Sequence, residues 1–198
     1  MTQVVLIRPG ATVYDEQNRI QGILDIPLSE RGRAEVAALA EALAGPPDGL
    51  ALAALYCGPG ENVVRTADAV GRALGLRPKR VDDLRNLDQG LWQGLQIDEI
   101  KRRHLKVFRQ WLESPLTVCP PRGEAVEDAL ERIRGALRPL TRRHRDEAIG
   151  LVVGDPLAKL VACYLKREPH VHLDERHPPC GFERIEVVPD TGRNGEPG

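Results

Sequence analysis

Three residues with useful chemistry each come directly after an apolar run that predicts a buried strand. They are Arg8, Cys57 and Asp155. A guanidinium binds carboxylates and phosphates, a thiolate is a nucleophile, and a carboxylate can pair with a guanidinium. Because ligands of parallel sheets sit beyond the carboxyl ends of the strands, we expect a site where these segments meet.

Two of these residues also have simpler structural interpretations. Cys57 could be a nucleophile, but a small buried hydrophobic residue is the favoured interpretation. Asp155 precedes Pro156, and an Asp at the N-cap with Pro at the first helical position is an ordinary helix start. Asp155 is therefore expected to cap a helix whatever its other role.

A third signal comes from histidines near the carboxyl end of the chain. His170, His172, His177 and Cys180 resemble a metal-binding tract. The stretch is rich in proline and lacks a regular ligand spacing, so a surface loop is favoured. We predict neither a metal nor an organic cofactor, and the scattered cysteines are expected to be free thiols.

The elements that must position these residues alternate between strands and helices. Strands are predicted at residues 4–7, 50–56, 149–153 and 182–188. Helices are predicted from Ser29 to about 45, from about 63 to 75, within 82–121, from 126 to about 140 and at 155–166. This alternation predicts an α/β three-layer sandwich with a mainly parallel sheet flanked by helices. We expect one domain over residues 1–188 and a mobile tail over 189–198.

Two helices carry more specific expectations. Ile97, Ile100, His104, Phe108 and Trp111 share one face of the helix expected within residues 82–121. In the following helix, proline 139 falls inside the apolar stripe, which predicts a kink or an early end.

Composition narrows the classes of function. The chain has 198 residues, of which 41% are hydrophobic, and its formal net charge is −1. A near-neutral protein lacks the basic surface that nucleic acids or anionic membranes attract. No apolar run is long enough to cross a bilayer and no export leader is evident, so we expect a cytoplasmic protein.

A series of short motifs, in order, resembles the histidine phosphatase superfamily, also called the phosphoglycerate mutase-like family. The resemblance covers roughly residues 4–188 and implies a phosphoglycerate mutase-like fold. The motifs are Arg8-Pro9-Gly10-Ala11-Thr12, Gln21-Gly22, residues 25–32, Thr66-Ala67, Leu84-Arg85, residues 90–94, Gly123-Glu124-Ala125 and Val152-Val153.

The resemblance also implies a catalytic set, most of which this chain lacks. Family members use a histidine nucleophile, two arginines and a second histidine that hold the phosphoryl group, and a carboxylic acid that protonates the leaving oxygen. Arg8 matches the first arginine. The nucleophile, second arginine, acid and second histidine fall at Pro9, Asn62, Asn86 and Asp155. A proline ring has no free lone pair with which to attack phosphorus.

These replacements predict a pseudoenzyme that acts as a binding, scaffold or assembly subunit with a protein partner or by self-association. An ion pair between Arg8 and Asp155 would fill the phosphate cradle with protein. One alternative is a sensor of a phosphate-like anion or phospho-metabolite that uses Arg8, Asn62, Asn86 and Arg65. Gln21 and Gly22 are further candidate ligand-binding residues. For Gly22 a turn, and for Arg65 an exposed helix surface, are the simpler interpretations. The other alternative is a residual phosphomonoester hydrolase.

Overall fold

A mixed, mostly parallel sheet organises the chain in the computed structural model, which describes residues 1–45, 50–168, 170, 173 and 180–187. Its strands are β1 (Thr2–Arg8), β2 (Ala54–Cys57), β3 (Lys79–Arg80), β4 (Ala148–Val152) and β5 (Gly181–Val187). Their order in the sheet is β3-β2-β4-β1-β5. All neighbours are parallel except β5, which pairs antiparallel with β1. The predicted α/β class with a mainly parallel sheet is confirmed.

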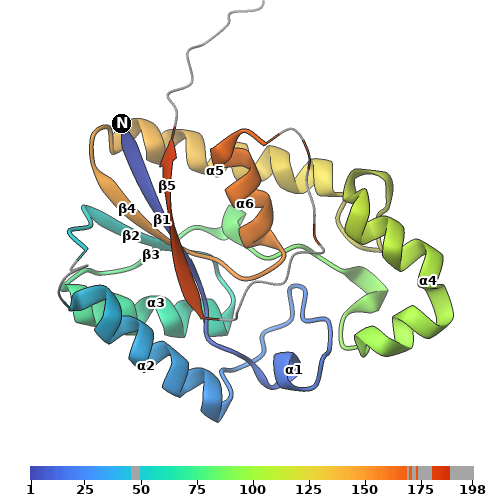
Figure 1. Ribbon diagram of the computed structural model, residues 1–198. Helices are drawn as coiled ribbons and strands as arrows, with labels where there is room; N and C mark the ends of the chain where they lie inside the picture. Colours follow the sequence, from blue (N-terminus) through green and yellow to red (C-terminus); the bar gives the residue numbers. More distant parts are fainter. Residues whose placement is uncertain (46–49, 169, 171–172, 174–179, 188–198) are drawn as a thin grey trace, which may run out of the picture.

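Helices cover both faces of this sheet (Figure 1). One face packs against α2 (Glu30–Ala44) and α3 (Glu61–Leu74), and the other against α5 (Val126–Arg143) and α6 (Leu157–Lys166). Strand β1 explains this arrangement, because Val4 and Leu6 lie in one core while Val5 and Ile7 lie in the other. A continuous apolar strand is therefore covered on both sides, as the three-layer prediction requires.

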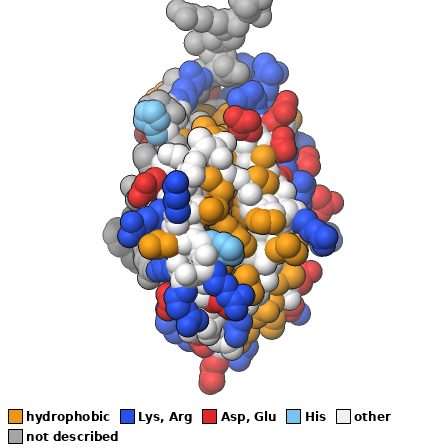
Figure 2. All heavy atoms as spheres, turned by 90° about the vertical axis from the view of Figure 1, so that its right-hand side faces the viewer, with side chains coloured by type: hydrophobic (Ala, Val, Ile, Leu, Met, Phe, Trp, Pro, Cys, Tyr) orange, Lys and Arg blue, Asp and Glu red, His pale blue; other side chains and the backbone are white. Residues whose placement is uncertain are grey.

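Smaller elements build the end of the sheet where the site lies. These are α1 (Val13–Glu16) and two short 3₁₀ turns at Asp82–Leu84 and Gly90–Trp92; a third 3₁₀ turn, Pro115–Thr117, packs beside α4. Helix α4 (Ile97–Glu113) projects away from the sheet in Figure 1. On this side of the molecule, hydrophobic side chains lie exposed among charged ones (Figure 2). The exposed large hydrophobic residues include Leu105 and Val107 of α4 and Leu116.

Helix α4 corrects one prediction. Ile100, Phe108 and Trp111 are buried on a common side, but His104 is exposed and has non-helical φ and ψ angles of −139° and 40°. The break at His104 interrupts the period of 3.6 residues, so His104 leaves the buried side that Ile100, Phe108 and Trp111 share.

Two further expectations were wrong: the early end of one helix, which was one of two predicted effects of Pro139, and the start of another helix at Asp155. Helix α5 does not end at Pro139 but continues to Arg143. Pro139 is exposed, so water can bind the backbone carbonyl that loses its helical partner. Helix α6 begins at Leu157 with Pro156 as its N-cap, and no side chain caps it. The Asp155 carboxylate turns toward Arg8 instead.

Some expectations concern residues outside the described part of the chain. The tail expected over residues 189–198 lies there, as do His172 and His177. Among the described residues, no helix combines the length and the apolar character that crossing a bilayer requires.

Candidate functional site

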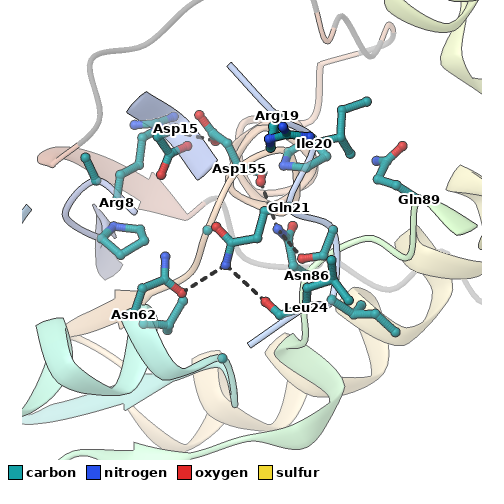
Figure 3. Close-up of a pocket in the computed structure, with 18 of the residues that line it drawn as sticks. Arg8, Asp15, Arg19, Ile20, Gln21, Leu24, Asn62, Asn86, Gln89 and Asp155 are labelled. Carbon is teal, nitrogen blue, oxygen red and sulfur yellow. Dashed lines mark hydrogen bonds and ion pairs between the residues drawn. The ribbon is translucent and has the colours of Figure 1, made fainter. Parts of the chain in front are cut away.

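A cavity of about 790 Å³ lies at the carboxyl end of the sheet. Its wall combines the segments that follow β1, β2 and β4 with the loop of residues 18–25 and part of α4. Figure 3 shows Arg8 and Asn62 on one side and Gln89 on the other. The volume falls within the range of small-molecule sites. The site therefore lies where the ends of the parallel strands predicted it.

Arg8 is buried at one end of the cavity between two carboxylates. Its Nη2 donates to Glu183 Oε1 at 3.1 Å, and its Nε lies 3.5 Å from Asp155 Oδ1. The expected ion pair with Asp155 is present, although 3.5 Å is long for a hydrogen bond. Glu183 was not expected. In the β1–β5 ladder it pairs with Leu6, two residues before Arg8, which brings its side chain diagonally next to the guanidinium.

Of these two carboxylates, Glu183 is held in its charged form by its neighbours. Burial raises the pKa of Glu183, but hydrogen bonds and charges from Lys166 and Arg8 outweigh it and lower the pKa below the ordinary value of 4.5. Lys166 Nζ donates to Glu183 Oε2 at 2.8 Å. The positive charge of Arg8 is thus compensated by protein groups, and an anion would have to compete with them.

This pKa shift predicts acid-sensitive stability. A carboxylate with a depressed pKa stabilises the fold fully above its unfolded pKa and loses that contribution as the pH falls through the folded value. Replacing Glu183 with Gln should therefore cost on the order of 1 kcal/mol at pH 7 and progressively less below pH 4.5. Urea unfolding across pH 3–7 measures this. Glu186→Gln, at an exposed position of the same strand, is the matched control. A Glu183→Gln cost that is constant with pH would contradict the assignment.

Pro9 lines the cavity directly after Arg8, so the position expected for a nucleophile carries no nucleophilic atom. Its carbonyl oxygen accepts a hydrogen bond from the backbone N–H of Cys180 at 3.0 Å. The alternative nucleophile, Cys57, is buried and does not line this cavity. Burial raises the pKa of its thiol to about 11, so the reactive thiolate is scarce at neutral pH.

The amide side chains of Gln21, Asn62 and Asn86 connect the segments that form the cavity wall beside Arg8 through hydrogen bonds. Gln21 Nε2 donates to the Leu24 carbonyl at 3.2 Å and to Asn62 Oδ1 at 3.4 Å, and Gln21 Oε1 accepts from the Thr12 hydroxyl at 3.3 Å. Figure 3 shows Gln21 between Asn62 and Asn86.

Asn86 joins segments that are distant in the sequence. Its Nδ2 donates to the carbonyls of Gly22 and Asp155, and its Oδ1 accepts from the N–H groups of Leu87 and Leu157. Both donors and both acceptor sites of the Asn86 amide are therefore hydrogen-bonded to backbone groups. An amide, with donors and an acceptor, can make these four contacts at once, whereas a carboxylate only accepts.

Helix α5 holds the loop that carries Asn86. Arg132 pairs bidentately with Glu124, at 2.6 and 2.7 Å, and donates to the backbone carbonyls of Asp83, Arg85 and Asn86. This explains the role of Glu124 in the motif at residues 123–125. A buried arginine fixed by a planar carboxylate makes the loop rigid.

The two remaining predicted site residues differ in position. Gly22 lines the cavity and has φ of 58°, the left-handed region that the turn interpretation requires. Arg65 does not line it; its side chain is 67% exposed and its Nε lies 3.9 Å from Glu61 Oε1.

The structure also brings to the cavity polar residues that the sequence did not single out. Asp15, Arg19, Gln89 and the indole of Trp111 all line it. No cluster of three metal-ligating side chains occurs within the described ranges. The cavity thus combines a charge-compensated, hydrogen-bonded end with a more apolar end near α4.

Similarity to known sequences extends over nearly the whole chain. The family described as "Histidine phosphatase superfamily (branch 1)" matches residues 4–194. Phosphoserine phosphatase 1 of Hydrogenobacter thermophilus is 28% identical over 152 residues, which are 77% of this chain and 70% of that protein. The bifunctional protein Rv2228c of Mycobacterium tuberculosis is 35% identical over 133 residues, which are 67% of this chain but 35% of that protein.

Solved structures resemble the fold over similar lengths. Bacillus stearothermophilus YhfR has 27% sequence identity and a TM-score of 0.82, with 95% of this chain and 92% of that chain covered. A mycobacterial glucosyl-3-phosphoglycerate phosphatase, Rv2419c, in complex with VO3 has 28% identity and a TM-score of 0.77, with 84% and 83% covered.

Proposed function

The chain belongs to the histidine phosphatase superfamily, branch 1, and we propose that it is a member that binds ligands without transferring phosphoryl groups. The observation that carries the proposal is Pro9, which occupies the nucleophile position and lines the cavity. Loss of an activated nucleophile alone can lower a rate by about 10⁶-fold.

The charges around Arg8 support the same conclusion. The relatives include proteins named as phosphatases, and one is solved with VO3. A phosphoryl group carries negative charge, and near Arg8 it would meet the carboxylates of Asp155 and Glu183. Repulsion between like charges at such distances is substantial in a partly enclosed site.

A second candidate function is residual phosphomonoester hydrolysis, which the names of the relatives favour. Without a protein nucleophile, water would have to attack phosphorus directly, and a carboxylate would have to accept its proton. Asp155 lines the cavity next to Arg8 and is the candidate base.

Phosphate release from phosphoserine and p-nitrophenyl phosphate tests the proposal. We expect the purified chain to release no more phosphate than buffer does. Pro9→His alone should also remain inactive, because Asn62, Asn86 and Asp155 still depart from the family's catalytic set and such groups act as a unit. Turnover that persists through repurification and is abolished by Asp155→Asn would overturn the proposal in favour of the hydrolase.

A protein partner or self-association is the remaining part of the proposal. Hydrophobic side chains exposed on the α4 side of the molecule (Figure 2) support it, as does the exposure of Leu105 and Val107 on α4 and of Leu116. Exposed apolar patches on soluble proteins often mark contact surfaces. Native mass spectrometry at micromolar concentration should reveal a dimer or a co-purified protein, and Leu105→Ser with Val107→Ser should weaken that complex. A strictly monomeric species that captures nothing would contradict this part.

A further inference from the structure

Gln89 is a buried amide with no hydrogen-bond partner. Its side chain lines the cavity, the residue is 1% exposed, and neither Oε1 nor Nε2 has a partner within the part of the chain that the structure describes. Rotating the amide by 180°, which exchanges Oε1 and Nε2, does not change this conclusion, because both atoms lack a partner. Buried amides are almost always hydrogen-bonded, since leaving one unpaired forfeits its hydration.

Trp111 repeats this pattern on the facing helix. It is 7% exposed and lines the same cavity, and its indole Nε1 has no partner among the described residues. Trp92, which follows Gln89 by three residues, contacts Trp111 with ring centroids 5.8 Å apart. The loop that carries Gln89 and helix α4 therefore pack together through these two rings, and each of the two segments carries an unpaired group in a residue that lines the cavity.

The unpaired groups lie away from Arg8. At the Arg8 end, Gln21 and Asn86 bond to protein through both ends of their amides. Figure 3 shows Gln89 on the opposite side, near Ile20. In the charged cluster, Arg8 Nε also lacks a hydrogen bond, but it lies 3.5 Å from the Asp155 carboxylate, whereas the Gln89 amide has neither a hydrogen bond nor an ion pair within the described residues.

We propose that this end of the cavity binds a neutral small molecule with a planar amide-type edge, such as a carboxamide or a lactam ring. Such an edge offers one N–H donor and one carbonyl acceptor side by side, which match the acceptor and donor of the Gln89 amide. A carbonyl also satisfies the indole N–H, which can only donate.

The walls around these groups fit the flat apolar body of such a ligand. They are formed by Ile20, Ile97, Phe108 and Leu112. Apolar walls with a few convergent polar groups are typical of small-molecule sites. The inference deepens the proposed function, because it names the class of ligand that a non-catalytic member would bind.

Two matched small molecules test whether the site binds a ligand edge that carries both a donor and an acceptor. Benzamide and N,N-dimethylbenzamide share the ring and the carbonyl, but the second has no N–H donor. In ¹⁵N-correlated NMR spectra of the full chain, benzamide should shift the Trp111 indole and Gln89 amide resonances with a dissociation constant in the millimolar range typical of fragments. We expect dimethylbenzamide to bind at least ~10-fold more weakly, since Gln89 Oε1 stays unpaired. Inorganic phosphate should leave both resonances unchanged.

Gln89→Met separates binding from folding. The change keeps the shape of the side chain and removes the unpaired amide, so the melting temperature should rise by roughly 2–6 °C while benzamide binding is lost. Gln93→Met is the matched control, because Gln93 Oε1 accepts from the Ile23 N–H at 2.7 Å. Loss of that bond should lower the melting temperature.

The possible results lead to different conclusions. Absence of benzamide shifts at its solubility limit, equal affinity for both probes, or a Gln89→Met protein that is less stable than the parent would each overturn this inference. None of these results concerns phosphate release. Turnover of phosphoserine would instead overturn the proposed function and leave the ligand class at Gln89 to be judged by the NMR titration.

Discussion

Replacing Arg8 with methionine is expected to lower the free energy of unfolding by about 2–3 kcal/mol. The guanidinium lies between Asp155 and Glu183, so its removal leaves two carboxylates facing each other without their shared cation. Breaking a fully buried pair costs about 3–5 kcal/mol, and the value here is smaller because both carboxylates retain some solvent contact. Urea unfolding monitored by tryptophan fluorescence measures the change.

Arg65→Met is the matched control for this prediction. Arg65 is 67% exposed and its contact with Glu61 spans 3.9 Å, so its loss should change stability by less than about 0.5 kcal/mol. The cost of Arg8→Met should also shrink below pH 4.5, where Glu183 can take up a proton. If the two variants lose the same stability at pH 7, Arg8 does not act as the buried counter-ion of the cavity.

The pair of Arg8 with Asp155 could be predicted from the sequence, whereas the pair with Glu183 could not. Arg8 and Asp155 both follow strands of the parallel part of the sheet, and the carboxyl ends of such strands meet at one edge. Glu183 lies 175 residues from Arg8 on an antiparallel strand. Its position depends on the β1–β5 register, which a strand of alternating residues does not determine by itself.

Gln89 illustrates a different limit. A glutamine in a loop is an ordinary surface residue by composition, and its significance arises only when burial removes water without providing a partner. His104 shows the converse case. Its spacing predicts burial, but the break in α4 exposes it. The helix predicted from Ser29 to about residue 45 was confirmed as α2, whose Val36, Leu39 and Leu43 are buried and follow one uninterrupted helical period.

Substituting alanine for Gly32 should destabilise the fold by about 3 kcal/mol or more, because the added methyl group meets backbone that cannot rotate away. A Cβ at Gly32 would lie 1.9 Å from the carbonyl oxygen of Ala11. A Cβ at Gly10 would likewise lie 2.4 Å from the carbonyl oxygen of Gly32. The segment that follows Pro9 therefore rests directly on the first turn of α2, and Ser29 N–H donates to the Ala11 carbonyl at 2.9 Å.

Gly135→Ala provides the control within the same fold, because Gly135 is an exposed position inside α5 and a Cβ there meets nothing within 4 Å. Alanine should stabilise this helix by about 0.5–1 kcal/mol, the opposite sign from Gly32→Ala. Chemical denaturation of both variants compares them directly. If Gly32→Ala were as stable as the parent, the loop would not be held by α2. The position of Pro9 and Arg8 in the cavity would then have to depend on the sheet alone.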